Sequence, residues 1–199
     1  MSLVKSLSSS EYLQIACIHK KMLKNSGFLS DCTIKFINNF YKQVHQFSSS
    51  IIIIDKLDNS DIITGFALLS TDSNNFFNKF IFKNLFLIIG NPINLFAFIK
   101  ALMRKTIKKK LFLYNIELVH IAVDKDFQGK GIAKKIISEL EAYLIKMNIK
   151  EYYLQVFDNN LIAKNLYIKN KFEILTSFKY GKRKKLLMKK NIAVCQNEK

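Results

Sequence analysis

The sequence predicts an α+β fold, a sheet with helices packed on it, and two observations lead to this prediction. Short runs of β-branched residues that suit buried strands occur beside segments with the three- and four-residue apolar spacing of helices. The two kinds of segment do not alternate strictly, so a purely parallel sheet with intervening helices is not expected. A length of 199 residues fits one domain, over residues 1–199.

The N-terminal part is predicted to form two helices and a pair of strands. The first helix covers about Glu11–Leu23, after serines that can cap it, and the second begins at Ser30 or Asp31. The β-branched run Ile51–Ile54 is too short for an independent helix, and Ile62–Leu69 returns beyond a turn. These two runs are expected to form an antiparallel hairpin.

A long apolar and basic stretch, Phe76–Lys110, lies within a helical insertion predicted over about 73–112. Gly90-Asn91-Pro92 interrupts it, and proline suits the first turn of a helix, so a helix is expected on each side. The sequence is compatible with several roles for this stretch. Its helices pack on the sheet or on a second subunit of a homodimer, or its aromatic side chains enter a membrane whose anionic head groups meet its lysines.

The C-terminal half is predicted to mix strands and helices and to close on a hairpin at Gly181. In order, its elements are the strand Ile116–Val123, the helix Gly131–Met147, the strand Tyr152–Phe157, the helix Leu161–Lys171 and the strands Glu173–Phe178 and Lys185–Lys189.

The chain carries 32 Lys and Arg against 15 Asp and Glu, a formal net charge of +17. Such a charge suits nucleic acid, an anionic membrane or a phosphorylated ligand. Arginine, which makes bidentate contacts to bases and phosphates, occurs only at Arg104 and Arg183, and this weighs against nucleic acid. The excess of lysine also fits a genome rich in A and T.

The cysteines Cys17, Cys32 and Cys195 form no CxxC pair, and no Cys and His cluster has metal-ligand spacing. We therefore expect reduced thiols and no metal. The N-terminus lacks the apolar core of a signal peptide, and no run of about 18 apolar residues could span a bilayer. A cytoplasmic protein is expected, with the inner membrane face as a peripheral alternative.

Residues 128–133, with the sequence QGKGIA, carry the chemistry and lie between a predicted strand and a predicted helix. Two glycines let the backbone approach a ligand, and the first turn of the helix leaves amides unpaired at its positive end. A phosphate or pyrophosphate suits such a place. The dinucleotide-binding fingerprint is not met, because its third glycine is missing.

The segment 123–133 resembles the acyl-CoA-binding signature of the GNAT superfamily of N-acetyltransferases, in which Gln/Arg-x-x-Gly-x-Gly/Ala opens a helix after a strand. Gln128, Gly131 and Ala133 match it. At the expected distance, residues 160–172 are similar to a second signature of the family, Asn-x-x-Ala-x-x-Leu-Tyr-x-Lys-x-Gly-Phe.

The resemblance covers roughly Asp61–Phe178 and implies the GNAT fold: a mixed, mostly antiparallel sheet, splayed at its centre, with helices on both faces. Lys171 departs from it, because it stands where the family has a glycine that ends the helix in the left-handed conformation.

By the same resemblance, acetyl-CoA is the acyl donor. The amides from Gln128 to Lys134 would hold its pyrophosphate, assisted by the Gln128 side chain, and the Leu118–Val123 strand would pair with its pantetheine arm. The residues implied at the acyl-CoA site are Leu118, Ile121, Ala122, Val123, Gln128, Gly129, Lys130, Gly131, Ile132, Ala133, Lys134, Asn160, Ala163 and Tyr167.

Three residues are candidates for catalysis. Tyr167 would donate a proton or a hydrogen bond to the departing thiolate. The alternative is that Tyr167 is an aromatic side chain of the hydrophobic core without a catalytic role. Glu117 is the favoured general base, because burial would raise the pKa of its carboxyl toward a useful range. His120 is the competing base and Asp158 a weaker one.

Each of the two favoured bases also has a structural interpretation. Glu117 would be a carboxylate at a strand end, paired with a lysine, and His120 would be a histidine whose hydrogen bonds are made within the sheet. Glu117, Val119, Ile121 and Val123 are expected to share one face of the strand, with His120, Leu118 and Ala122 on the other.

The resemblance thus implies an N-acetyltransferase that moves an acetyl group from acetyl-CoA to a primary amine by direct attack. The stretch Gly27-Phe28-Leu29-Ser30 resembles members seen with surface-polysaccharide assembly, so an amino sugar is the preferred acceptor. The alternative is a non-catalytic module on the same fold that binds acyl-CoA or nucleic acid.

Overall fold

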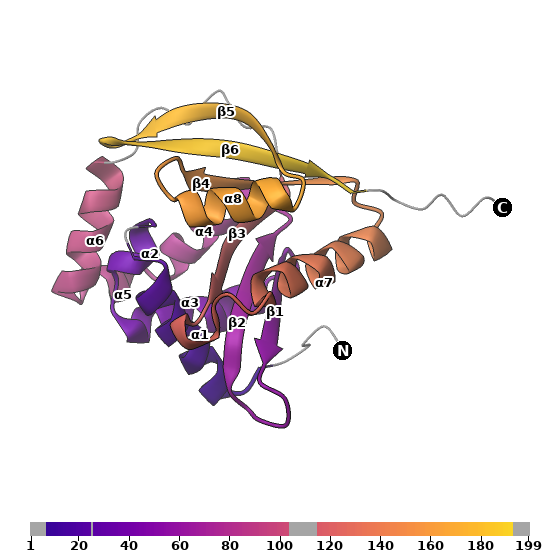
Figure 1. The fold of residues 1–199 in the computed structure, drawn as a ribbon. Helices are drawn as coiled ribbons and strands as arrows, with labels where there is room; N and C mark the ends of the chain where they lie inside the picture. Colours follow the sequence, from indigo (N-terminus) through magenta and orange to yellow (C-terminus); the bar gives the residue numbers. More distant parts are fainter. Residues whose placement is uncertain (1–6, 25, 104–114, 193–199) are drawn as a thin grey trace.

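The computed structural model describes residues 7–24, 26–103 and 115–192, and these form a sheet with helices on both faces (Figure 1). In chain order the elements are α1 (Ser9–Met22), α2 (Phe28–Asp31), α3 (Ile34–His45), β1 (Ser50–Lys56), β2 (Ile63–Ser70), α4 (Ser73–Lys83), α5 (Leu85–Ile89), α6 (Pro92–Met103), β3 (Glu117–Val123), α7 (Ile132–Lys146), β4 (Glu151–Phe157), α8 (Leu161–Lys169), β5 (Glu173–Tyr180) and β6 (Arg183–Asn191).

The six strands lie in the order β1-β2-β3-β4-β6-β5. Every neighbouring pair is antiparallel except β3 and β4, which run parallel and pair only at Glu117 with Tyr153 and Leu118 with Leu154. Beyond Leu118 the two strands part, so the sheet is splayed at its centre. The predicted α+β class, the mostly antiparallel sheet and the central splay are confirmed.

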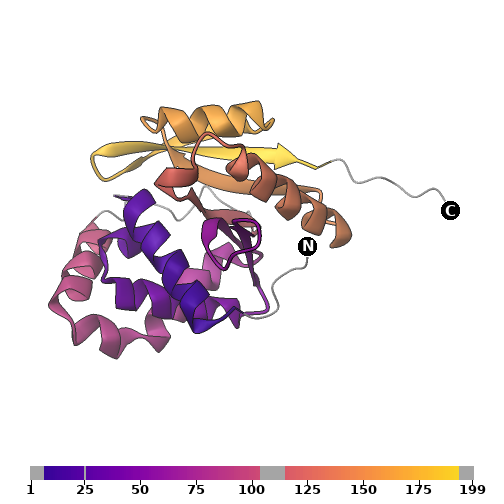
Figure 2. The same ribbon diagram turned by 60° about the horizontal axis from the view of Figure 1, so that its bottom comes forward.

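Helices cover both faces of the sheet (Figure 2), and a hydrophobic core lies between the sheet and the helices on each face. The first core lies under α1 and α3 and includes Phe40, Tyr41 and Phe66. The second core lies under α7 and α8 and includes Leu140 and Tyr152. Because each large apolar side chain contributes about 1.5–3 kcal/mol when fully buried, these cores stabilise the two halves of the splayed sheet.

The structure differs from the predicted elements at α3 and in the insertion. The hydroxyl of Thr33 accepts a hydrogen bond from the Phe36 amide at 3.3 Å, so α3 begins after Thr33 and not at Ser30 or Asp31. The insertion contains three described helices, α4 to α6, where two were predicted. Residues 104–112 of the predicted insertion lie outside the described residues, and the single domain stays a prediction.

A β-bulge interrupts the pairing of β3 with β2. His120 pairs with Leu68 and Leu118 pairs with Leu69, so Val119 is an extra residue without a partner on β2. A bulge of this kind leaves one residue unpaired and bends the strand. The bulge lies next to the point where β3 leaves β4.

The bulge overturns the predicted faces of β3. Leu118 and Ile121 pack with the second core, whereas Val119 and Ala122 pack with the first. Leu118 therefore faces away from Ala122, and Ile121 away from Val119. The physical reason is that one extra residue shifts the two-residue alternation of a strand by one place.

The left-handed end of α8 is present although glycine is replaced there by lysine. Lys171 has a φ of 65°, and the amide of Phe172 donates to the carbonyl of Tyr167 at 3.0 Å. This is the hydrogen bond of a helix cap in which glycine is usual. The cap thus keeps its geometry at the cost expected for a residue with a Cβ.

Replacing Lys171 with glycine is expected to stabilise the protein by about 1 kcal/mol, because the left-handed strain outweighs the added freedom of the unfolded chain. Denaturant unfolding of the variant would show a higher midpoint with an unchanged slope. Lys169→Gly, two residues earlier at the last residue of α8, is the matched control and should destabilise the protein by up to about 1 kcal/mol. If both substitutions changed the free energy of unfolding equally and in the same direction, Lys171 would not be strained.

Candidate functional site

The loop from β3 to α7 contains a row of backbone amides without hydrogen-bond acceptors among the described residues. Gly129 and Gly131 have φ values of 78° and 79°, and a Cβ at either position would meet no atom within 4 Å. Gly131 is the N-cap of α7 and supplies no capping side chain. Within the described chain, the amides of residues 129–134 donate to no acceptor. Such amides at the positive end of a 15-residue helix suit an anionic ligand.

The Gln128 side chain supports this loop instead of pointing freely outward. Its Nε2 donates to the carbonyl of Val123 at 3.1 Å and so ties the loop to the end of β3. Lys130 lies over the ring of Phe127, with its Nζ 5.2 Å from the centroid. Lys134 is exposed on the first turn of α7. The predicted residues Gln128, Lys130 and Lys134 therefore lie in this loop or in the first turn of α7.

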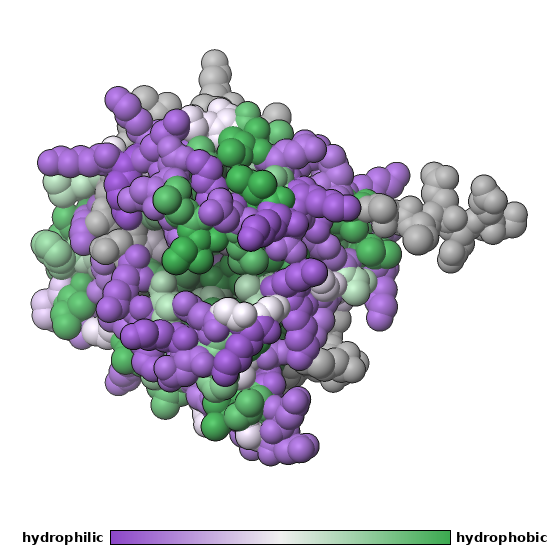
Figure 3. All heavy atoms as spheres, viewed as in Figure 1, coloured by the Kyte–Doolittle hydropathy of each residue, from purple (hydrophilic) through white to green (hydrophobic). Residues whose placement is uncertain are grey.

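The open edge of β3 lies beside this loop. Past Leu118, the residues Val119–Val123 pair with β2 or bulge away from it, and β4 does not pair with them. A hollow with apolar side chains at its floor opens over β3, between α8 and the loop that leads into α7 (Figure 3). The predicted residues Leu118, Ile121, Ala122 and Val123 belong to the strand beneath it.

Helix α8 borders the same hollow. Asn160 caps this helix, because its Oδ1 accepts a hydrogen bond from the Ala163 amide at 3.2 Å. Tyr167 is buried in the second core, with its ring 5.5 Å from that of Phe172. Burial raises the pKa of the Tyr167 hydroxyl, which stays protonated at neutral pH. Among the described residues this hydroxyl has no hydrogen-bond partner.

Glu117 lies at the start of β3, where the gap begins. Its Oε1 accepts a hydrogen bond from Nε2 of Gln155, on β4, at 3.0 Å. Gln155 alternates along β4 with Leu154 and Val156, which lie in the second core, so Glu117 is on the opposite side of the sheet. Gln155 was not among the predicted site residues, because only the β3–β4 pairing brings it to Glu117.

His120 belongs to a chain of hydrogen bonds that the sequence did not reveal. The Tyr41 hydroxyl lies 3.2 Å from Nδ1 of His120 and 2.7 Å from Nδ1 of His19. A phenol has one proton, so it donates to one imidazole and accepts from the other. Burial and the charge of Lys185 lower the pKa of His120 to about 3, and the ring is neutral at pH 7.

Asp158, the weaker base candidate, is engaged in ion pairs. Its carboxylate lies 2.9 Å from Nζ of Lys164 and 3.8 Å from Nζ of Lys184. The hydrogen bond from Lys164 is the main cause that lowers the pKa of Asp158. A carboxylate held in this way by two ammonium groups is a poor proton acceptor.

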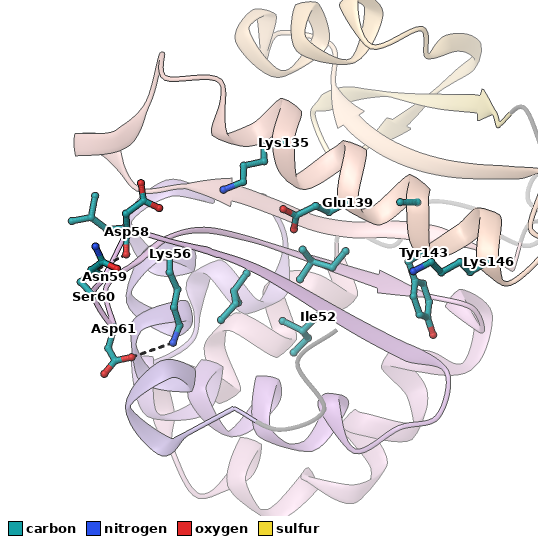
Figure 4. A pocket seen from close by; sticks show the side chains of 14 residues that line it. Ile52, Lys56, Asp58, Asn59, Ser60, Asp61, Lys135, Glu139, Tyr143 and Lys146 are labelled. Atoms are coloured by element: carbon teal, nitrogen blue, oxygen red, sulfur yellow. Dashed lines mark hydrogen bonds and ion pairs between the residues drawn. The ribbon is translucent and has the colours of Figure 1, made fainter. Parts of the chain in front are cut away.

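A separate cavity of about 830 Å³ lies at the outer edge of β1, between this strand and α7 (Figure 4). Its lining mixes Lys56, Lys146 and Glu139 with isoleucines of β1. Lys135 also lines it and pairs with Asp55. The described residues contain no cluster of three or more His, Cys, Asp or Glu side chains that could hold a metal ion.

Comparisons with known proteins agree on the fold. The chain resembles the ribosomal-protein-S18-alanine N-acetyltransferase of Escherichia coli (15% identity, TM-score 0.59, 98% of this chain and 96% of that one). It also resembles an N-acetyltransferase of Staphylococcus aureus Mu50, with 14% identity and a TM-score of 0.62 over 94% of this chain and 96% of that one. A third structural neighbour is the PaiA N-acetyltransferase of Thermoplasma acidophilum, solved in complex with coenzyme A. It has 14% identity and a TM-score of 0.53 over 93% of this chain and 95% of that one.

Sequence relatives point the same way. A stretch of 46 residues, 23% of this chain, is 41% identical to "Probable spermine N(1)-acetyltransferase" of Bacillus subtilis subsp. natto (strain BEST195). This match spans 30% of that curated relative. Residues 36–172, which contain the glycine loop, the splayed strands and Tyr167, match the model of the acetyltransferase (GNAT) family. The chain therefore belongs to the acetyltransferase (GNAT) family.

Proposed function

We propose that this protein transfers the acetyl group of acetyl-CoA to a primary amine by direct attack of the amine on the thioester. The observation that carries the proposal is the row of unpaired amides at residues 129–134, which follows the strand β3 whose edge β4 leaves largely unpaired. A pyrophosphate can accept several of these amides at once, and the helix dipole of α7 favours its charge.

The pantetheine arm would run from this loop along the free edge of β3. Val119–Val123 present a strand edge that β4 leaves unpaired, and an extended arm with amide groups can pair with such an edge. Asn160 and Ala163, at the start of α8, would border the arm. The thioester would then lie in the gap, between Tyr167 on one side of the sheet and Glu117 on the other.

The reaction forms a C–N bond and breaks the C–S bond of the thioester. Glu117 would take the proton that the amine loses, and Gln155 would hold the carboxylate in place. Tyr167 would give a proton or a hydrogen bond to the departing thiolate. His120 is the second candidate base, but a pKa of about 3 makes it a weak acceptor of the ammonium proton at neutral pH.

The charges near Glu117 favour a neutral or anionic acceptor over a polycation. Lys185 lies on the same face of the sheet as Gln155, because its strand neighbour Leu186 points into the second core. Lys189 lies on that face too, but it is paired with Glu151 at 2.6 Å. The charge of Lys185 already lowers the pKa of His120. A second positive charge on the acceptor would be repelled there.

An amino sugar, carried on a nucleotide or a lipid phosphate, therefore stays the proposed acceptor. Polyamines are the contrasting class, because the curated relative that matches 46 residues is named for spermine. The homodimer and the cytoplasmic location stay predictions.

The proposal is tested by following CoA release from acetyl-CoA with a panel of primary amines. We expect a higher kcat/KM with a sugar nucleotide that carries a free amine than with spermine, and a large loss of turnover in Glu117→Gln. Higher kcat/KM with spermine would overturn the acceptor class. A thermal shift with acetyl-CoA but no turnover with any amine would instead identify a module that only binds acyl-CoA.

A further inference from the structure

Helices α4 to α6 expose large apolar side chains to solvent. Phe82 is 88% exposed, Phe86 is 90% exposed and Met103 is 83% exposed. With Ile89, Ile93 and Phe96 they make up a surface that we call the apolar patch. Large exposed patches of this kind mark sites of interaction with proteins or membranes.

The patch rests on a firmly held support. Asn84, between α4 and α5, is buried; its amide donates to Gln43 and to the carbonyl of Phe80, and its oxygen accepts from Asn39 and Gln43, over 2.7–3.0 Å. Asn94 of α6 accepts a hydrogen bond from the Thr33 amide at 3.1 Å. These contacts fix one side of the helices to α3, so the exposure of the other side is a property of the folded state.

Helix α6 is apolar except for Asn94 and Lys100. Its sequence, PINLFAFIKALM, contains one charged residue, Lys100, which forms an ion pair with Asp31 at 3.0 Å. Ala97 is buried in the first core, whereas Phe96 faces solvent. A helix that is hydrophobic on nearly all sides normally lies in a protein core or in a membrane, and here one side has neither.

The charges around the patch favour an anionic lipid surface as its partner. Lys79 and Lys83 lie on α4, where Lys79 is paired with Asp72 at 2.8 Å. Residues 104–110 lie outside the described residues; their sequence, directly after α6, adds Arg104 and four lysines. A second copy of this chain would bring the same net charge of +17 against it, whereas anionic head groups would neutralise it.

We propose that the apolar patch docks the protein on an anionic membrane, with Phe82, Phe86 and Phe96 inserted among the head groups. No helix among the described residues is long and apolar enough to cross a membrane, so the binding is interfacial. The proposal is independent of which amine is acetylated. It would place the enzyme close to acceptors held at a lipid surface.

The test is co-sedimentation of the full-length protein with vesicles of phosphatidylcholine, with and without phosphatidylglycerol. We expect binding to the anionic vesicles at low salt and a clear loss of binding at high salt. Replacing Phe82 and Phe86 together with serine should lower the partition coefficient by roughly tenfold or more. Both side chains are almost fully exposed, so the variant should keep the Tm of the unmodified protein.

The matched control is the double variant Leu13→Ser and Met147→Ser, which removes two exposed apolar side chains outside the patch. It should bind vesicles as the unmodified protein does. Absence of binding to anionic vesicles, or equal binding of the two double variants, would overturn the proposal. A dimer in sedimentation velocity without lipid that Phe82→Ser and Phe86→Ser dissociates would also overturn it, because the patch would then join two copies of the chain.

Discussion

Replacing Tyr167 with phenylalanine is expected to lower kcat for acetyl transfer by about 10²–10⁴-fold, while the affinity for acetyl-CoA stays nearly unchanged. A thiolate leaves a tetrahedral intermediate more readily when a positioned donor stabilises its developing charge. Burial raises the pKa of Tyr167, so the phenol remains a donor over the whole working pH range. Phenylalanine keeps the edge-to-face contact with Phe172 and removes only the hydroxyl.

The matched control is Tyr152→Phe in the same core. The Tyr152 hydroxyl donates to Oε1 of Glu141 at 2.7 Å, so its loss should reduce stability by about 1–3 kcal/mol and leave kcat largely unchanged. The measurement is steady-state kinetics of CoA release, with acetyl-CoA binding followed by calorimetry. An acyl donor with a more acidic thiol should shrink the effect of Tyr167→Phe. If kcat were unchanged in Tyr167→Phe, Tyr167 would be an aromatic side chain of the core and not a proton donor in the reaction.

Local signals in the sequence were sufficient for the loop and helix that would bind the pyrophosphate. The two glycines at 129 and 131 adopt the positive φ values that only glycine takes without strain, and α7 follows them directly. The left-handed end of α8 at Lys171 was not expected, because lysine there departs from the glycine of the family pattern. For the glycine loop, the information lies within a few neighbouring residues.

The remaining parts of the site depend on contacts between distant segments. The bulge at Val119 results from the register of β3 against β2, which residue alternation within β3 does not specify. Gln155 meets Glu117 only because β3 and β4 pair in parallel for two residues before they part. The chain from His19 through Tyr41 to His120 joins α1, α3 and β3, and none of its members has a distinctive local motif.

Lowering the pH from about 7.5 to about 5.5 is expected to reduce the free energy of unfolding by about 2–3 kcal/mol through His19 and His120. Burial, the charge of His120 and that of Lys20 lower the pKa of His19 well below its usual value. Burial and the charge of Lys185 lower the pKa of His120 to about 3. Tyr41, hydrogen-bonded to both rings, stays neutral because burial raises its pKa.

The sign follows from proton binding in the two states. Below about pH 6.5 an unfolded histidine takes up a proton that the buried, neutral ring refuses, so the unfolded state gains about 1.4 kcal/mol per histidine for each pH unit. Stability is therefore fully present above this pH and is lost as the pH falls toward the folded-state pKa. The paired carboxylates of Glu11 and Glu151, whose pKa values are lowered, change protonation only at more acidic pH.

Denaturant unfolding at a series of pH values measures this slope, and the double variant His19→Gln and His120→Gln should flatten it. The comparison of slopes remains valid if the variant is less stable at every pH, because only the change with pH reports on the histidines. Equal slopes in the two proteins would show that both rings are already protonated in the folded state. The Tyr41 hydroxyl could not then accept from one ring and donate to the other, since a doubly protonated imidazole offers no acceptor.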